Sequence, residues 1–554
     1  MSAHLKQDEP DTANRLDSMK QGVIGKPLSR VEGLAKVTGT APYAAEYPVD
    51  GCAEGVLVTA TITRGEIVRI DKDSVLDRPG VIAVIDDERL TTRAAQGTAN
   101  EAPQQSPQTV CYWGQPIALV VAETFEQARD AAKHLVVEYR EEPGAPLFPA
   151  EVEAEEQEDE TVRQGDLAQA MSTAAHSVDV TYTTKGHASA AMEPHAAIAE
   201  WDGEKLTVHA SLQMLNYNIT ELADSLGLEE DKVRLVSRFV GGGFGSKLGI
   251  SEETVAASLA AMELERPVRV VMSRQQVFQC IMRRSETTQR LRLAADADGR
   301  LTGFGHEALV SNLPGETFAE PVLQSSHFLY GADNRELMLN VARIHLMTAG
   351  SVRAPGEAVG MPALEGAMDV LAEEVGIDPV ELRLRNIPED DPEEGLPFSS
   401  HKLAECLRQG ADAFGWDAGP RKPRMTREGE WWVGTGMASA ARVHNVGEAK
   451  ARVTLKPDGT ALVETDMTDI GTGTYTILAQ IAGEMLGLDT ADVLVDLGDT
   501  RHPRGPGSGG SWGASSSGSA VYVACKALRE ELASRVGVAE TELDLANGQV
   551  VGGQ

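Results

Sequence analysis

Gly241-Gly-Gly-Phe-Gly245 closes a stretch of sequence that begins at Asp202-Gly203 and recurs later, from Asp458-Gly459 to Gly509-Gly-Ser-Trp-Gly513. Each copy contains an Asp-Gly turn, an apolar alternation, a loop, a helical stretch that ends in Leu-Gly-Leu, a Val-rich strand and a glycine-rich loop. The two strands cover 233–236 and 493–497. Because ligands tend to bind outside the carboxyl ends of strands, this duplication predicts one large polar ligand held between two halves of the molecule.

The composition indicates an acidic globular protein with more than one domain. The chain has 554 residues, of which 42% are hydrophobic, and its net charge is -34. Such a length exceeds what one hydrophobic core usually organises. The charge argues against a nucleic-acid partner, because phosphate binding needs clustered Lys and Arg. No apolar window is long enough to span a bilayer, and residues 1–22 are too polar for a signal peptide, so we expect no membrane insertion.

The cysteines are spaced too widely for a disulfide framework or a protein-held metal. No pair has the CxxC spacing, which argues against a zinc site or an iron-sulfur cluster within this chain. If the chemistry is oxidation or reduction, the electrons must therefore leave through another polypeptide. The five cysteines are Cys52, Cys111, Cys280, Cys406 and Cys525.

Hydrophobic periodicity predicts an α+β domain near the start of the chain. Residues 1–22 read as a flexible arm and 23–148 as a compact domain, followed by an acidic segment, 149–162, that we interpret as a solvated linker. Within the domain, 125–135 has the apolar spacing of a helix. The predicted strands are 55–60, 81–85, 116–122 and 135–139.

The two repeats divide the rest of the chain into halves at 163–400 and 401–554. In the first half, 251–264 reads as a helix with Ser251 as its N-cap. Asp298-Gly299, between two apolar stretches, predicts a hairpin. Helices are expected at 360–376 and 379–386.

The glycine-rich loops complete none of the common nucleotide motifs. Ser246 precedes Lys247, which reverses the Walker order, and the GxGxxG pattern that starts at Gly471 fails at Thr476. Glycine nevertheless lets backbone N–H groups form an anion nest, above all where Gly473-Thr474 leads into a helix. One such loop could equally be a tight turn, but four in repeated register favour a site for pyrophosphate.

Few other side chains form a recognisable catalytic pattern. Arg353, in Ser351-Val-Arg-Ala-Pro-Gly-Glu357, could bind an anion or pair with Glu357, and the sequence leaves both open. Arg442 is a similar case. His187, Glu193 and His195 fit no zinc spacing, so we interpret them as structural. The chain has no GxSxG elbow, which argues against a serine hydrolase.

Taken in order, the motifs resemble those of the molybdenum-binding large subunit of the xanthine oxidase/aldehyde oxidase family of molybdenum hydroxylases. The resemblance implies an α+β fold with a hammerhead-like domain at 23–148 and duplicated molybdopterin-binding domains at 163–400 and 401–554, the second incomplete. The matching segments are Gly25-Lys-Pro with Arg30, Lys36-Val-Thr-Gly39, Gly114-Gln-Pro, Val120-Val-Ala-Glu123, Met192-Glu-Pro-His195, Gly241 to Gly245, Arg353-Ala-Pro-Gly356, Asp378-Pro, Gly471-Thr-Gly473 and Gly509 to Gly513.

The chain looks most like the large subunit of bacterial three-subunit aldehyde oxidases. That resemblance implies molybdenum carried by molybdopterin cytosine dinucleotide, with the metal held by the pterin dithiolene and not by protein side chains. It also implies a [2Fe-2S] small subunit and an FAD-binding medium subunit as partners. The expected reaction oxidises an aldehyde to a carboxylic acid with water as the oxygen source. The complex would be cytoplasmic, or periplasmic if exported with a partner that carries a signal.

The resemblance also assigns site residues. Gln213 would lie beside the oxo group of the metal, Arg353 would face the metal centre, and Arg442 would orient the substrate. The residues expected to bind the cofactor are Gly241, Gly242, Gly243, Phe244, Gly245, Arg353, Ala354, Gly471, Thr472, Gly473, Gly510, Ser511, Trp512 and Gly513.

Three departures from the family pattern bear on the reaction. Leu248 stands where purine-oxidising relatives have a carboxylate, and no cysteine lies near Ser351 as in carbon monoxide dehydrogenases. Both favour aldehydes, above all aromatic or hydrophobic ones. Relatives continue beyond the position of Gln554 and supply a catalytic glutamate there, so we expect this chain alone to be nearly inactive. The alternatives are a subunit that hydroxylates N-heterocycles of the xanthine or isoquinoline type, and a non-catalytic truncated remnant.

Overall fold

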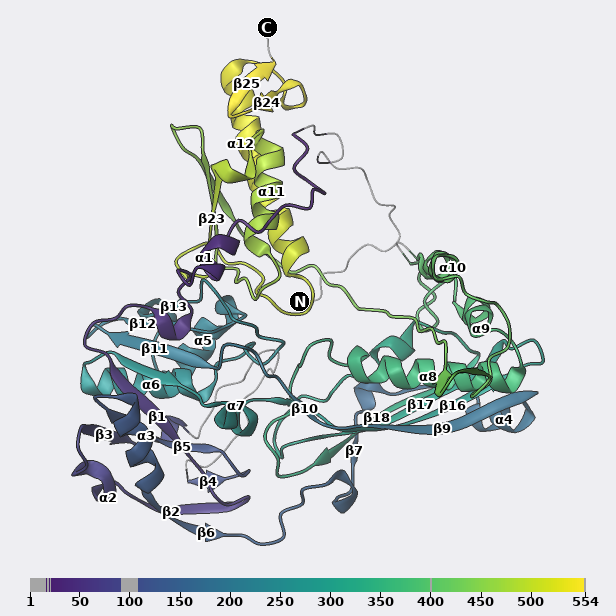
Figure 1. Cartoon of the computed structure of the whole chain (residues 1–554), viewed down its shortest axis with the longest axis horizontal. Helices are drawn as coiled ribbons and strands as arrows, with labels where there is room; N and C mark the ends of the chain where they lie inside the picture. Colours follow the sequence, from purple (N-terminus) through teal and green to yellow (C-terminus); the bar gives the residue numbers. More distant parts are fainter. Residues whose placement is uncertain (1–15, 17–18, 20, 91–107, 399–400, 553–554) are drawn as a thin grey trace.

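The computed structural model describes Leu16, Met19 and residues 21–90, 108–398 and 401–552. It contains three principal sheets, each covered by helices around its own hydrophobic core (Figure 1). This α+β architecture confirms the predicted fold class. The flexible arm expected at 1–22 lies almost wholly outside the described residues.

The first sheet has seven strands and joins the N-terminal domain to the first repeat. Its order is β13-β12-β11-β14-β1-β5-β3. β1 pairs in parallel with β14, with Ala53 opposite Val268, so the sheet crosses the boundary expected near residue 148. The strands are β1 Ala53–Thr59, β3 Val81–Ile85, β5 Pro116–Ala122, β11 Ala196–Trp201, β12 Leu206–Ala210, β13 Val233–Val236 and β14 Val268–Val271.

Helix α6, Glu252–Leu264, lies on the seven-stranded sheet and is buried from Glu252 to Ala261. Ser251 occupies the predicted N-cap position, but its side chain makes no capping bond. Instead its hydroxyl donates to Glu253 Oε1 at 3.0 Å. The helix is therefore held by burial of small apolar residues against the sheet and not by its cap.

A smaller sheet and two helices complete the N-terminal domain. The sheet has the order β4-β2-β6. Helix α3, Phe125–His134, begins with a capping box in which Thr124 and Gln127 satisfy each other's backbone N–H groups. The other elements are α2 Asp73–Leu76, β2 Gly65–Asp71, β4 Thr109–Val110 and β6 Val136–Glu141.

The second principal sheet is built around the predicted hairpin at Asp298-Gly299. β16, Thr287–Ala295, pairs antiparallel with β17, Leu301–Asn312, which confirms that hairpin. Helix α8, Glu357–Val375, covers the sheet (Figure 1). The remaining elements of this unit are β7 Glu155–Glu156, β8 Val162–Gln164, α4 Leu167–Thr173, β9 His176–Thr184, β18 Asn334–Arg343 and α9 Pro379–Asn386.

The acidic segment 149–162 is more than a linker. β7 and β8 both pair with β18, with Glu155 opposite Val341 and Val162 opposite Leu337. Its charged side chains are largely exposed, as expected, but its backbone adds an edge to the second sheet. The acidic composition indicated that the side chains are exposed, but it could not indicate that the backbone pairs with β18.

The two repeats have the same topology, which confirms the predicted duplication. In the first, β11 and β12 are antiparallel and β12 and β13 are parallel, with α5, Leu215–Leu226, between β12 and β13. In the second, β21, β22 and β23 pair in the same way around α11, and a long helix, α12, follows. The elements are β21 Arg452–Leu455, β22 Ala461–Thr465, α11 Thr474–Leu486, β23 Val493–Leu497 and α12 Gly513–Val536.

The Leu-Gly-Leu signature marks the same helix end in both repeats. Gly227 follows α5 with a φ of 70°, and Gly487 follows α11 with a φ of 67°. This left-handed conformation is strained for residues with a Cβ, which is why glycine ends so many helices.

The ends of β13 and β23 meet at a seam between the repeats. Ser237 N–H donates to Gly498 O at 2.7 Å, and Val236 bridges Asp499 in an antiparallel arrangement. The buried Asp499 carboxylate accepts hydrogen bonds from Arg234 and Arg501.

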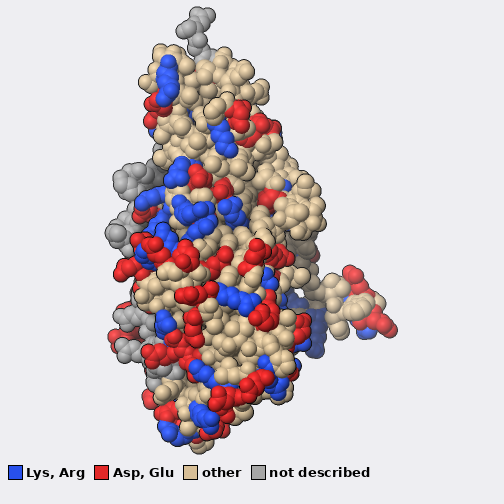
Figure 2. Space-filling view, turned by 90° about the vertical axis from the view of Figure 1, so that its left-hand side faces the viewer, with Lys and Arg blue, Asp and Glu red and all other residues tan. Residues whose placement is uncertain are grey.

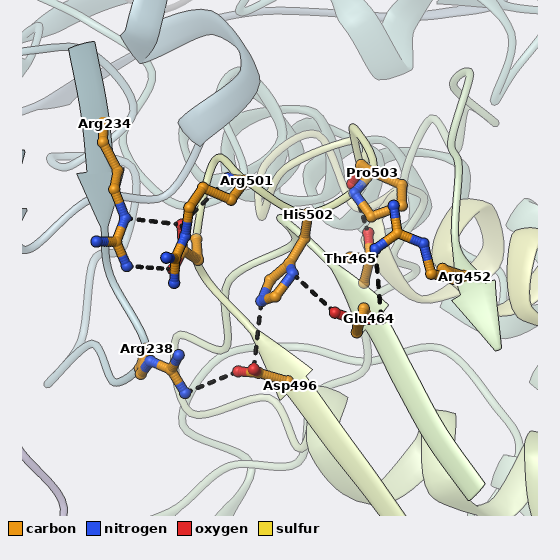
Figure 3. Close-up of polar contacts among 10 residues, drawn as sticks. Arg234, Arg238, Arg452, Glu464, Thr465, Asp496, Arg501, His502 and Pro503 are labelled. Atoms are coloured by element: carbon orange, nitrogen blue, oxygen red, sulfur yellow. Dashed lines mark hydrogen bonds and ion pairs between the residues drawn. The ribbon is translucent and has the colours of Figure 1, made fainter. Parts of the chain in front are cut away.

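A second polar cluster supports the seam. Arg238 bonds Asp496 at 2.7 Å, and His502 lies between Asp496 and Glu464 (Figure 3). Charged groups from both repeats therefore cross the seam, and they fix how the two halves sit against each other.

An N-terminal strap, residues 22–32, crosses helix α11. The N–H groups of Gly22, Val23 and Ile24 all donate to the carboxylate of Glu484, and Gln480 Nε2 donates to Val23 O. The remaining short elements include the hairpin β19–β20 and a terminal hairpin β24–β25. Their bounds are α1 Gly33–Val37, β10 His187–Ala188, α7 Arg274–Cys280, β15 Arg283–Arg284, α10 Leu403–Phe414, β19 Thr426–Glu428, β20 Trp431–Val433, β24 Asp544–Ala546 and β25 Gln549–Gly552.

The surface mixes both signs of charge. Figure 2 shows acidic and basic side chains interspersed over one face, with Lys and Arg densest at mid-height. In the part of the chain that the structure describes, no helix has the length and apolar character needed to cross a membrane.

Candidate functional site

Gln213 lies at the junction of the two repeats and bonds to a glycine-rich loop of each. Its Oε1 accepts from Gly245 N–H at 3.0 Å in the first loop, and its Nε2 donates to Ser508 O at 2.6 Å in the second. Its backbone carbonyl accepts from Ser508 N–H at 2.8 Å and from Thr468 Oγ1 at 2.9 Å. The two loops are therefore neighbours, as the duplication predicted.

The first glycine-rich loop is packed too closely for side chains at two positions. A Cβ on Gly243 would lie 2.3 Å from Gln213 Oε1, and one on Gly245 would lie 1.8 Å from Ser351 O. Gly245 also has a φ of 98°, and Phe244 between them adopts a φ of 57°. The glycines are thus required by close approach of backbone to neighbours, while the half-exposed Phe244 ring stands at the surface of the loop.

A buried ion pair holds this first glycine-rich loop in place. Lys247 Nζ lies 2.9 Å from Glu193 Oε2, and the same oxygen accepts from Gly241 N–H at 2.7 Å and from Ser211 Oγ at 2.5 Å. Burial lowers the pKa of Lys247, against the opposing pull of Glu193. The pair ties the loop to the first sheet through charge-assisted hydrogen bonds.

The His187, Glu193 and His195 set does not converge. His195 Nε2 contacts Ser246 O at 2.9 Å, and burial together with the Lys247 charge lowers the pKa of His195 to about 3. His187 is exposed in β10. Among the described residues no three His, Cys, Asp or Glu side chains are grouped so as to hold a metal ion. The structural interpretation of this segment is supported by these contacts.

The turn that carries Arg353 is fixed against the first loop by its backbone. Arg353 N–H donates to Phe244 O at 2.7 Å. Arg284 donates to the carbonyls of Val352 and Arg353 and pairs with Glu320 at 2.6 Å, and Glu320 in turn accepts from Gly356 N–H. The Arg353 side chain is exposed and has no ion pair within the described ranges.

Arg442, and not Arg353, pairs with Glu357. Arg442 Nη1 lies 2.8 Å from Glu357 Oε1, and its Nε donates to Ser511 Oγ at 3.2 Å. The pairing of Arg353 with Glu357 that the sequence left open is therefore wrong. Arg442 instead connects the start of α8 to the second glycine-rich loop.

The Gly471-Thr-Gly473 turn already uses two of its N–H groups. Gly471 and Gly473 donate to Asp469 Oδ1 at 2.6 and 3.4 Å, and Gly473 is the N-cap of α11. The guanidinium of Arg30 lies beside Gly473, 3.5 Å from where its Cβ would be. The positive N-terminal end of α11 is therefore already occupied by the Asp469 carboxylate, and the cationic Arg30 lies next to it.

The second glycine-rich loop packs against the first repeat. A Cβ on Gly507 would lie 2.9 Å from Met214 Sδ, and one on Gly509 would lie 2.8 Å from Leu248 Cδ2. Gly510 and Ser511 both have a positive φ, of 55° and 60°, just before α12 begins. Leu248 is buried in this contact.

Several buried oxygens near these loops have no hydrogen-bond partner among the described residues. They include Glu320 Oε2, Glu357 Oε2, Asp469 Oδ2 and Ser517 Oγ. Buried polar atoms are nearly always satisfied, so these oxygens call for a ligand with N–H or O–H donors. A pterin and a nucleotide base both carry such donors, and the set therefore fits a molybdopterin cofactor.

The structure brings most of the predicted residues into one bonded network. Gln213, the first loop, the Arg353 turn, Arg442 and Ser511 are linked by the contacts above. The ion pairs of Lys247 with Glu193, of Arg284 with Glu320 and of Arg442 with Glu357 were not predicted. The two partners of each pair lie 36 to 85 positions apart in the chain, so no local pattern could have found these pairs.

Family models match nearly the whole chain. Two that are described as molybdopterin cofactor-binding domains match residues 150–387 and 409–553. A third, described as the a/b hammerhead domain of aldehyde oxidase and xanthine dehydrogenase, matches residues 38–143.

Known proteins agree with these matches. The chain is 43% identical to the aldehyde oxidoreductase molybdenum-binding subunit PaoC of Escherichia coli K12, over 99% of this chain and 75% of PaoC. It is 28% identical to the nicotine 6-hydroxylase large subunit of Paenarthrobacter nicotinovorans, over 96% of this chain and 70% of that subunit.

The fold is also that of a solved structure. Quinoline 2-oxidoreductase from Pseudomonas putida 86 superposes with a TM-score of 0.84 at 22% identity, over 96% of this chain and 74% of that chain. The domain matches and the identity to PaoC show that the chain belongs to the xanthine oxidase/aldehyde oxidase family of molybdenum hydroxylases, as a molybdenum-binding large subunit.

Proposed function

We propose that this chain binds molybdenum as molybdopterin cytosine dinucleotide where its two repeats meet, and that it oxidises aldehydes to carboxylic acids with water as the oxygen source. The observation that carries the proposal is the contact of Gln213 with both glycine-rich loops. The 43% identity to a relative named as an aldehyde oxidoreductase subunit supports the substrate class. When bound, the cofactor supplies the two-electron oxidation.

Gln213 acts in this proposal by position. One N–H of its Nε2 donates to Ser508 O, and its Oε1 accepts from Gly245 N–H. A primary amide carries two N–H donors, so the second one is left to face a ligand. An amide held at both ends keeps that donor in one orientation without rearrangement when a ligand binds.

Arg353 and Arg442 differ in whether their charge is paired. Arg442 is balanced by Glu357 and adds no net charge, whereas the exposed Arg353 guanidinium is free to bind an anionic or polarised oxygen. Leu248 is buried against Gly509, and the family resemblance puts a carboxylate at this position in purine-oxidising relatives. These features support a neutral carbonyl substrate.

The partners in this proposal are a [2Fe-2S] small subunit and an FAD-binding medium subunit that receive the electrons. In the described part of the chain the five cysteines form no disulfide, and no three potential metal ligands are grouped. The complex is placed in the cytoplasm, or in the periplasm if a partner carries an export signal.

Metal and nucleotide analysis tests the cofactor. The chain is co-expressed with its partner subunits in a host that makes the cytosine dinucleotide, and molybdenum and acid-released CMP are measured. We expect both, in equal amounts, and protein that lacks both would refute the proposal. Competition between benzaldehyde and quinoline for binding to this protein, which needs no turnover, then separates an aldehyde site from an N-heterocycle site.

A glycine pair provides a matched control. In Gly243→Ala the new Cβ would displace Gln213 from its position, so we expect loss of molybdenum and CMP with a soluble protein retained. In Gly410→Ala, on α10, no atom lies within 4 Å of the new Cβ, and the cofactor content should not change. Equal cofactor in both variants would contradict the role given to the first loop.

A further inference from the structure

Two buried side chains of opposite charge, Arg284 and Glu320, hold the turn that carries Arg353. Arg284 Nη1 bonds Glu320 Oε1 at 2.6 Å, and the two side chains are 4% and 0% exposed. Glu320 Oε1 also accepts from Gly356 N–H at 2.7 Å. A buried ion pair costs desolvation that its Coulomb attraction alone often fails to offset. Further hydrogen bonds are therefore needed to account for this pair.

The other donors of Arg284 bind three successive carbonyl groups of the turn. Its Nη2 donates to Val352 O at 2.9 Å and to Arg353 O, and its Nη1 reaches Ala354 O at 3.4 Å. A guanidinium can do this because its donors form a rigid planar fork, whereas a lysine ammonium is a single point charge. Arg284 thus fixes the peptide groups on both sides of the Arg353 Cα.

The turn needs such support because part of its backbone is strained. Ala354 has a φ of 54°, in the left-handed region where a residue with a Cβ is disfavoured. A conformation of this kind persists only where its surroundings impose it. The segment before the turn is anchored to β15, since Arg283 N–H donates to Thr348 O at 3.0 Å and Gly350 N–H donates to Arg283 O at 2.9 Å. β15 therefore holds this stretch of chain both by its backbone and by the Arg284 side chain.

The position of the turn is transmitted to Gln213 through backbone contacts. Arg353 N–H donates to Phe244 O at 2.7 Å, and the next residue of the first loop, Gly245, donates its N–H to Gln213 Oε1 at 3.0 Å. Ser351 O lies 1.8 Å from where a Cβ on Gly245 would be. The turn and the first loop are therefore in direct backbone contact, so a shift of one moves the other.

The ion pairs around the turn leave the charge of Arg353 available. Glu320 compensates Arg284, and Glu357 is paired with Arg442. The exposed Arg353 has no ion pair within the described ranges. Its guanidinium is thus the group at this turn that can meet a ligand, and its direction depends on the backbone that Arg284 fixes.

We propose that Arg284 is a positioning residue, which sets through the carbonyls of the turn how the Arg353 guanidinium meets the oxygen of a carbonyl substrate. The inference rests on the proposed function, in which Arg353 binds that oxygen. Arg284 itself touches no substrate in this arrangement, because it is buried and its Nη atoms bond to Glu320 and to the turn.

Benzoate binding to the cofactor-loaded complex tests this role. Benzoate is the anion of the acid expected from benzaldehyde, and its affinity is measured by calorimetry. In Arg284→Lys the charge stays and the fork is lost, so we expect the benzoate Kd to rise about 10-fold, the size of one hydrogen bond to a charged group. Arg290→Lys is the matched control, because Arg290 makes a two-bond but exposed pair with Asp179, and its Kd should not change. Equal affinities in wild type and Arg284→Lys overturn the proposal.

Chemical rescue separates positioning from general stabilisation. Arg284→Ala removes the fork, and added guanidinium, far below denaturing concentrations, should occupy the vacated space and restore benzoate affinity. Methylammonium carries the same charge without a fork and should not restore it. Wild type is measured at the same guanidinium concentration. Failure of guanidinium to restore affinity, or a folded Arg284→Ala that binds benzoate as wild type does, contradicts the positioning role.

Hydrogen exchange on the chain alone needs neither cofactor nor variant. If the turn is held in place before a ligand binds, the Arg353 amide should exchange within about 10-fold of the rate of the Arg283 amide, which also has a backbone acceptor. In Arg284→Lys the Arg353 amide should exchange faster and the Arg283 amide should hardly change. Fast exchange at Arg353 in wild type would overturn the inference even if molybdenum and CMP are bound. A protected Arg353 amide in a complex that lacks both would instead refute the proposed function alone.

Discussion

Gln213→Leu is expected to destabilise the junction of the two repeats. Leucine is similar in size to glutamine but offers no polar atoms, so Ser508 O and Gly245 N–H lose their partners, at 2.6 and 3.0 Å. Leaving a buried donor or acceptor unpaired costs about 1–3 kcal/mol each. The two losses together lower the free energy of unfolding by about 2–6 kcal/mol. The weaker contact from Lys247 N–H, at 3.3 Å, adds to this in the same direction.

The measurement is urea unfolding followed by far-ultraviolet circular dichroism. The change should appear as a lower midpoint with an unchanged slope, because the surface exposed on unfolding stays the same. Gln169→Leu is the matched control, since Gln169 is exposed on α4, and a surface exchange of this kind stays within about 0.5 kcal/mol. If both variants unfold at the same urea concentration, Gln213 does not join the two loops.

Three further predictions concern buried charges. Burial alone would raise the pKa of Asp499, but hydrogen bonds from Arg234 and Arg501 outweigh burial and lower that pKa. The stability that the lowered pKa contributes is present above the pKa of the unfolded state, about 4, and is lost below that pH. The Tm gap between wild type and Asp499→Asn should therefore narrow as the pH falls from about 5 to about 3, and parallel curves would argue against the seam. Burial raises the pKa of Glu253 to about 7, so the folded protein is more stable when the Glu253 carboxyl group is protonated. That stability is lost as the pH rises through this pKa. Glu253→Gln should accordingly gain Tm relative to wild type at pH 8 compared with pH 5, and a pH-independent difference would show that Glu253 does not titrate. Glu365→Leu removes the 2.7 Å bond to the buried Arg383 and leaves the half-exposed Asp369 as its ion-pair partner, so the loss should stay below the about 3–5 kcal/mol of a fully broken buried pair; the double variant with Arg383→Leu should recover part of that loss in a thermal unfolding assay.

The turns and helix ends could be predicted from the sequence because their signals are local. Asp298-Gly299 sits between two apolar stretches, and Gly227 and Gly487 each follow a helix within one turn. Turn chemistry and helix termination depend on residues a few positions apart, and the structure contains them where they were expected. The α+β class follows from these local elements.

Long-range pairing could not be predicted in the same way. Nothing near Ala53 indicates that β1 would pair with β14, more than two hundred residues later. The acidic composition of 149–162 describes its exposed side chains and carries no information on the backbone bonds of β7 and β8. In the site, the sequence suggested Arg353 as a possible partner for Glu357, and only the fold shows that Arg442 pairs with it.

The N-terminal strap has a consequence for how the protein is made. Its acceptor, Glu484, lies 461 positions after Val23. At synthesis rates of about 5–20 residues per second, the strap is synthesised roughly 25–90 s before Glu484. The strap therefore cannot close over α11 until this much later part of the chain has been made, and until then its N–H groups lack their acceptor.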